Sequence, residues 1–121
     1  MNIRNVGNAE HYLWGDGCDG WRLLSRPDLS VIQERIPPGR GEVLHFHSRA
    51  RQVFFVLSGR LDIKLGDTST RLEAGDSIEV QPGIHHSVRN PAEADAHFLV
   101  ISAPSTAGDR ENVNPAPAGG T

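Results

Sequence analysis

The sequence has little of three features that many proteins of its size use. It contains one cysteine in 121 residues, Cys18, so neither an internal disulfide nor a multi-thiolate metal site is available. The 12 basic and 15 acidic residues give a formal net charge of -3 without a basic run, which argues against nucleic acid and anionic membranes as partners. No apolar run approaches the ~20 residues of a membrane span, and residues 1–10 do not resemble a signal peptide. We therefore expect a cytoplasmic protein stabilised by packing.

Helical periodicity is also missing. No segment keeps an apolar period of 3.6 residues, so we expect minimal helix. The 13 glycines and 8 prolines separate short apolar runs, and turns recur about every ten residues. The expected strands are residues 29–36, 53–57, 61–65, 68–73, 78–80 and 97–101. Many short strands at this spacing predict an all-β sandwich or barrel.

Two adjoining runs predict a hairpin. Residues 53–57 are continuously apolar, and after Ser58 and Gly59 the apolar residues of 61–65 alternate with polar ones. We interpret the pair as a hairpin with one buried face. The chain is long enough for one domain, in which strands in residues 1–28 precede a barrel of residues 29–103. Residues 104–121 are rich in proline and small residues with almost nothing apolar to bury, so we expect a flexible C-terminal tail.

The most informative local feature is His45-Phe46-His47. Side chains two apart on a strand point to the same face and lie roughly 6.6 Å apart along it. Two imidazoles so placed can reach one metal ion at about 2.1 Å, while Phe46 points to the opposite face. Histidines on an exposed strand face are also commonly just solvated, so this pair alone leaves both readings open.

Two motifs resemble those of the cupin family. The first family motif contains a glycine, a His-x-His pair, a glutamate and a second glycine; here it is matched by Gly39, His45, His47, Gln52 and Gly59, with glutamine in the glutamate place. The second is matched by Gly75, Gly83, His86 and Asn90, with the proline displaced to Pro82. The resemblance covers residues 30–103.

The resemblance implies a double-stranded β-helix, the RmlC-like jelly-roll barrel, with one divalent transition metal near its mouth. It implies a homodimer, in which residues 1–28 would act as a dimer arm. The ligands that it implies are His45, His47, Gln52 and His86, and the ion would be Mn, Fe, Ni or Zn. Strand alternation agrees, because Gln52 and Phe54 continue one face and His86 shares a face with Val88 and Asn90. His85 then points away.

Gln52 is the departure from the family pattern. A glutamine binds through a neutral carbonyl oxygen, which leaves the charge of a divalent ion uncompensated and makes it a stronger Lewis acid. The amide nitrogen needs an acceptor, so we expect a partner that holds Gln52. The alternative is that Gln52 only supports a metal held by three histidines and water. Cupins with a similar His-His-Gln-His set include enzymes that open or isomerise unsaturated uronate sugars, and some manganese hydroxynitrile lyases.

Five more residues are candidates for a substrate pocket. Arg49 and Arg51 lie between His47 and Gln52, where they would orient a carboxylate or phosphate or stay solvated. Phe54 and Phe98 would line the pocket or fill the core, and His97 would face the pocket or outward.

Three functions are compatible with these residues. The favoured one is a metal-dependent isomerase, lyase or ring-opening enzyme acting by Lewis-acid chemistry on a small polar or anionic molecule. The second is an Fe(II) dioxygenase, since three histidines leave coordination positions for substrate and oxygen. The third is a non-catalytic cupin that binds a small molecule. Spacing places no glutamate, aspartate or tyrosine at the site, so the catalytic residues stay unassigned.

Overall fold

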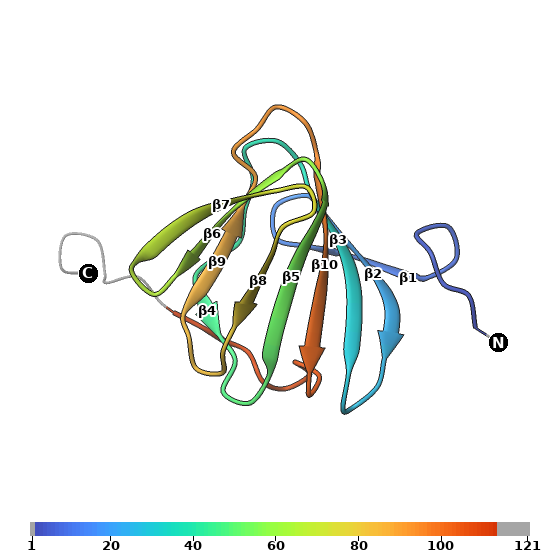
Figure 1. The fold of residues 1–121 in the computed structure, drawn as a ribbon. Helices are drawn as coiled ribbons and strands as arrows, with labels where there is room; N and C mark the ends of the chain where they lie inside the picture. Colours follow the sequence, from blue (N-terminus) through green and yellow to red (C-terminus); the bar gives the residue numbers. More distant parts are fainter. Residues whose placement is uncertain (1, 114–121) are drawn as a thin grey trace.

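The computed structural model describes residues 2–113, which form eleven β-strands and no helix. The strands are β1 (Glu10–Trp14), β2 (Cys18–Ser25), β3 (Ser30–Ile36), β4 (His45–Phe46), β5 (Arg51–Ser58), β6 (Arg60–Leu65), β7 (Thr68–Glu73), β8 (Ser77–Val80), β9 (His86–Arg89), β10 (Ala96–Ala103) and β11 (Glu111–Asn112). A six-stranded sheet, β1-β2-β3-β10-β5-β8, faces a five-stranded sheet, β11-β4-β9-β6-β7 (Figure 1). The predicted all-β jelly-roll barrel is confirmed. No helix able to span a membrane occurs among the described residues.

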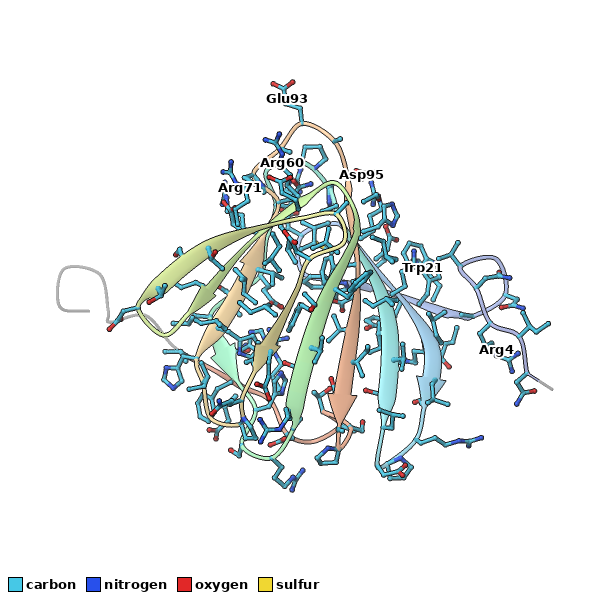
Figure 2. All side chains as sticks on the ribbon, viewed as in Figure 1. Arg4, Trp21, Arg60, Arg71, Glu93 and Asp95 are labelled. Carbon is cyan, nitrogen blue, oxygen red and sulfur yellow. The ribbon has the colours of Figure 1, made fainter. Side chains whose placement is uncertain are left out.

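The core lies between the two sheets and follows strand alternation. In β5 and β10 every second side chain is buried, so Phe54 and Phe98 point inward while their neighbours face the other side. Leu61, Ile63 and Val88 of the opposite sheet complete the same cluster, and side chains of both sheets fill the interior (Figure 2). The rings of Phe54 and Phe98 stack with centroids 6.0 Å apart.

The predicted hairpin between β5 and β6 is wrong. Strand β5 pairs with β8 and β10, whereas β6 pairs with β7 and β9 in the other sheet. Gly59 joins them at a φ of +78°, and a Cβ there would collide with the carbonyl oxygen of Asp95. The chain therefore crosses from one sheet to the other at Gly59. Alternation determines which face of a strand is buried, but it does not identify the neighbouring strand.

The predicted flexible tail needs a correction over residues 104–113. Strand β11 pairs with β4, the Val113 N–H donates to the Leu44 carbonyl at 2.8 Å, and Asp109 is buried. Polar hydrogen bonds hold this segment against the barrel, which an argument from apolar content alone cannot detect. We call residues 105–113 the strap. The rest of the expected tail, residues 114–121, lies outside the described residues.

The N-terminal strands extend the six-stranded sheet and close one side of the interior. Strand β1 pairs with β2, which places Tyr12 opposite Gly20, and Gly20 in turn lies opposite Glu34 of β3. A Cβ on Gly20 would collide with the Tyr12 ring. The missing side chain therefore lets Tyr12 lie across β2 toward Glu34.

Candidate metal centre

Three histidines converge inside the barrel. His45 of β4 is paired directly with His86 of β9, and His47 follows two residues after His45. The ring centroids of His45 and His86 lie 4.3 Å apart, and those of His47 and His86 lie 5.5 Å apart. All three residues are buried, and one ring nitrogen from each lies within 4.8 Å of the others. This spacing fits nitrogen ligands around one ion at about 2.1 Å.

Hydrogen bonds determine which nitrogen of each ring is available. The Nδ1 atoms of His45, His47 and His86 lie 2.9, 2.7 and 2.9 Å from the carbonyl oxygens of Val43, Asp109 and Ile84, respectively. A carbonyl oxygen only accepts, so each Nδ1 donates and each Nε2 keeps its lone pair. The Nε2 atom of His86 is buried and has no hydrogen-bond partner among the described residues.

The environment also keeps these rings neutral. Burial lowers the pKa of His45 to about 3 and that of His86 to about 4, although the bonds to carbonyl oxygens oppose the shift. Burial lowers the pKa of His47 as well. Neutral imidazole is the form that binds a metal, so the three rings are in the ligand form at neutral pH.

Gln52 lines the same cavity as His45 and His47. Its amide nitrogen donates to the Ser102 hydroxyl at 3.0 Å, which is the kind of partner expected from the sequence. Its carbonyl oxygen Oε1 is buried and has no hydrogen-bond partner in the part of the chain that the structure describes. A buried acceptor without a partner costs about 1–3 kcal/mol. The orphaned oxygen and the orphaned Nε2 of His86 therefore fit a divalent transition metal, and the four residues could form its site.

Asp109 of the strap holds His47 in place. Its main-chain carbonyl accepts the hydrogen bond from His47, while its carboxylate accepts three backbone N–H bonds, from Ser48 at 2.9 Å, Arg49 at 3.0 Å and Ala50 at 2.9 Å. Desolvation raises the pKa of this carboxyl, but the three N–H bonds outweigh it and lower the pKa below its usual value. One residue thus fixes both the ring orientation of His47 and the turn after it. No sequence pattern links Asp109 to a histidine 62 residues away.

A cavity of about 200 Å³ adjoins the histidines. Its walls include the proposed ligands His45, His47 and Gln52, together with Phe54, Ser102 and Thr106. They also include four residues that the sequence argument did not assign to the site: Tyr12, Glu34, Glu42 and Arg110. Sequence spacing placed no glutamate or tyrosine at the site, whereas the fold brings two glutamates and a tyrosine to the cavity. The sequence pattern could have placed Glu34, because alternation along β3 points it inward with Ile32 and Ile36. It could not have placed Tyr12 and Arg110, because they come from distant segments.

The two glutamates are held largely in their protonated form. Burial raises the pKa of Glu34 to about 8, opposed by the Tyr12 hydroxyl and the charge of Arg110. Burial and the nearby Glu34 raise the pKa of Glu42 to about 8, again opposed by Arg110. Arg110 Nη1 lies 3.8 Å from Glu42 Oε2, and Tyr12 Oη lies 3.5 Å from Glu34 Oε2. Carboxyls that gain or lose a proton near neutral pH beside a metal site are suited to acid–base catalysis.

The other sequence candidates lie in different places. Phe54 lines the cavity, whereas Phe98 belongs to the core behind it. Arg49 and Arg51 are exposed and do not line the cavity; Arg51 pairs with Glu79. His97 faces the outer side of the six-stranded sheet, where its ring stacks on Trp21 with centroids 6.3 Å apart.

His85 points away from the cluster, as expected. It is exposed and stacks on the outward ring of Phe46 at 4.8 Å. Cys18 is buried, and burial raises the pKa of its thiol to about 11, so a nucleophilic role has no support.

The sequence and the fold match known proteins. The family model described as "Cupin domain" matches residues 32–102. An uncharacterized protein of Methanocaldococcus jannaschii is 25% identical over 75 residues, which are 62% of this chain and 60% of that protein. The oxalate-binding protein of Thermotoga maritima is 27% identical over 67 residues, and the match spans 55% of each chain. The structure of KdgF from Halomonas sp. superposes with a TM-score of 0.79 at 19% identity, covering 87% of this chain and 94% of that chain, which shows a shared fold.

Proposed function

The chain belongs to the cupin domain family, and we propose that it is an enzyme that uses one divalent transition metal as a Lewis acid. The reaction is an isomerisation, ring opening or elimination on a small polar or anionic molecule. The observation that carries the proposal is the unpartnered carbonyl oxygen of Gln52 beside three neutral histidines. The ligands are His45, His47, Gln52 and His86, and the ion is Mn, Fe, Ni or Zn. The location is the cytoplasm, where the free thiol of Cys18 stays reduced.

A ligand set without charge favours Lewis-acid chemistry. When bound, the ion would keep its full positive charge and polarise a carbonyl or enolate oxygen of the substrate. The absence of a carboxylate ligand gives less support to an Fe(III) state, which is why oxygen activation by an Fe(II) dioxygenase ranks second. The neutral shell also favours an anionic ligand from solution.

Glu34 is the best-placed proton carrier. It is the charged residue on the inner face of β3, it lines the cavity, and the Tyr12 hydroxyl lies 3.5 Å from its carboxyl. In this role the protonated Glu34 donates its proton to the substrate through Oε2, and the carboxylate that results then takes a proton back, while Tyr12 orients the carboxyl. A carboxyl positioned beside a polarised carbonyl can transfer the proton that an isomerisation or elimination requires.

The cavity suits a small molecule with oxygen substituents. Its volume of about 200 Å³ is below the range of about 300–1,000 Å³ usual for drug-sized ligands. Arg110 and the hydroxyls of Ser102 and Thr106 offer donors to such oxygens. The relative named as an oxalate-binding protein agrees with a small anion at the metal, and it also keeps a non-catalytic binding role as the third alternative.

The test begins with the metal content of the natively purified protein. The metal-free protein is then reloaded separately with Mn, Fe, Ni and Zn and mixed with keto-acids, uronates and sugar phosphates, and products are followed by NMR. We expect His47→Ala to lose the metal and the activity, whereas His85→Ala removes an exposed histidine and should keep both. Metal retention by His47→Ala would refute the ligand assignment.

The same experiment separates the alternative functions. Oxygen uptake with iron and catechols or thiols would identify a dioxygenase. Tight binding of a small molecule at an intact metal, with no turnover of any substrate by any metal form, would identify a non-catalytic binder and refute the enzyme.

We also propose that two copies pair through the outer face of the six-stranded sheet. Phe55, Leu99, Val53, Ile101 and Val31 are cross-strand neighbours there, and none of them is fully buried within one chain. A contiguous apolar face of this kind is typical of a two-fold interface between identical subunits. Phe55→Asp should give a monomer in analytical ultracentrifugation while retaining metal. A monomeric wild-type protein at micromolar concentration would refute the pairing.

A further inference from the structure

A second compartment adjoins the metal cavity. It has a volume of about 300 Å³ and lies between strands β1 to β3 and the first residues of the strap. Tyr12, Ile32 and Thr106 line both spaces, so these three side chains form the boundary between them. A ligand that fills the metal cavity and passes this boundary would enter the second compartment.

Arg22 provides a positive charge in this compartment. Its Nε atom donates to Glu10 at 2.9 Å, and its guanidinium carbon lies 4.4 Å from the centroid of the Tyr12 ring. Within residues 2–113 no hydrogen bond occupies the two terminal nitrogens of Arg22, and its side chain is 39% exposed. The terminal N–H groups are therefore available, and a guanidinium pairs well with the planar oxygens of a carboxylate or with a phosphate.

Ser30 adds an independent observation. It lines the same compartment, it is only 5% exposed, and its buried hydroxyl oxygen has no hydrogen-bond partner among residues 2–113. A buried hydroxyl without a partner is unfavourable, so nearly all such groups in folded proteins find one. Ser25 and Ser105 line the compartment as well and offer further hydroxyl donors.

We propose that this compartment binds the oxyanion tail, a carboxylate or a phosphate, of an elongated substrate whose other end lies at the metal centre. The inference rests on the proposed function, because it takes the metal cavity as the place of the reacting end. Gln52 on β5 and Arg22 on β2 are separated by three strand spacings, or about 14 Å between backbones. Each side chain extends into the space that it lines, so the distance between their polar ends is shorter than the distance between the two backbones. A substrate chain of five or six carbons suits this distance better than a two-carbon acid does.

The test uses three probes that share one head and differ only in the tail. Gluconate, glucarate and 6-phosphogluconate all carry the same hydroxy-acid end, and their other end is a hydroxyl, a carboxylate or a phosphate. Isothermal titration calorimetry with the metal-loaded protein should show at least one charged-tail probe binding about tenfold more tightly than gluconate. Comparing the affinities of glucarate and 6-phosphogluconate shows whether the compartment prefers a carboxylate or a phosphate tail.

Arg22→Ala should remove the preference for charged-tail probes over gluconate and leave the affinity for gluconate unchanged. Ser30→Ala should reduce the same preference, although it leaves the charge of the compartment as it is. Arg26→Ala is the matched control, because Arg26 carries the same charge, is exposed and does not line the compartment. The proposal is overturned if the three probes bind equally, if Arg22→Ala weakens gluconate as much as the charged probes, or if Arg26→Ala has the same effect. Metal content measured on the same samples shows whether the protein binds the metal, so a failure of the metal-site proposal can be told apart from a failure of this one.

Discussion

Replacing Asp109 by alanine should weaken the metal site without touching any proposed ligand. The substitution removes the carboxylate that accepts backbone N–H bonds from Ser48, Arg49 and Ala50. A hydrogen bond to a charged group contributes about 1.5–3 kcal/mol, and only Ala50 of the three donors is buried, so we expect the free energy of unfolding to fall by about 2–4 kcal/mol. The main-chain carbonyl that orients His47 then loses its anchor. Loss of a group that orients a metal-bound histidine typically lowers metal affinity about 10- to 100-fold, or about 1.4–2.7 kcal/mol.

Competition with a chromogenic chelator measures the affinity for Zn²⁺ or Ni²⁺ directly, and urea unfolding of the metal-free protein measures stability. Asp109→Asn keeps one acceptor oxygen and should lie between wild type and Asp109→Ala. Glu93→Ala, at the exposed loop between β9 and β10 (Figure 2), should match wild type in both measurements. Because coupling is reciprocal, bound metal should slow amide exchange in residues 110–113. A folded Asp109→Ala protein with wild-type metal affinity would refute the reasoning.

Three further outcomes follow from the same geometry. Gln52→Glu adds a negative charge to the proposed shell, so metal affinity should rise and the affinity of the loaded protein for oxalate should fall in calorimetry; no change in either would show that Gln52 is not a ligand. Gly20→Ala places a methyl group against the Tyr12 ring and should cost about 1–3 kcal/mol in urea unfolding, a cost that should shrink in a Tyr12→Ala background. Burial raises the pKa of Glu34 from its ordinary 4.5 to about 8, so its contribution to the stability of the metal-free protein is complete below pH 4.5 and is lost as the pH rises through 8. Glu34→Gln should remove this dependence and gain a few kcal/mol relative to wild type between about pH 5 and 8.5; parallel stability curves would contradict the assignment.

The strands were predictable because they depend on local periodicity, whereas the histidine cluster was predicted from the resemblance to two cupin motifs. Alternation along β5 and β9 correctly placed Gln52, Phe54 and His86 on inward faces, and glycine and proline marked where strands end. The same alternation would have placed Glu34 inward, but a single charge among apolar positions is not a pattern that predicts a catalytic group. The sequence predicted that the amide nitrogen of Gln52 has an acceptor, but it did not identify the residue. That acceptor is Ser102, which lies 50 residues away.

The sequence by itself determined an all-β chain with a His-x-His pair, a glutamine and a later histidine at the spacing of two cupin motifs, because side-chain direction along a strand is a local property. Only the tertiary structure decided what surrounds that cluster. It routed β5 and β6 into different sheets, laid Tyr12 across Gly20 toward Glu34, and held Asp109 of the strap against His47. These contacts join segments that are distant in sequence, and their energies depend on strand pairing and on hydrogen bonds that no local pattern encodes.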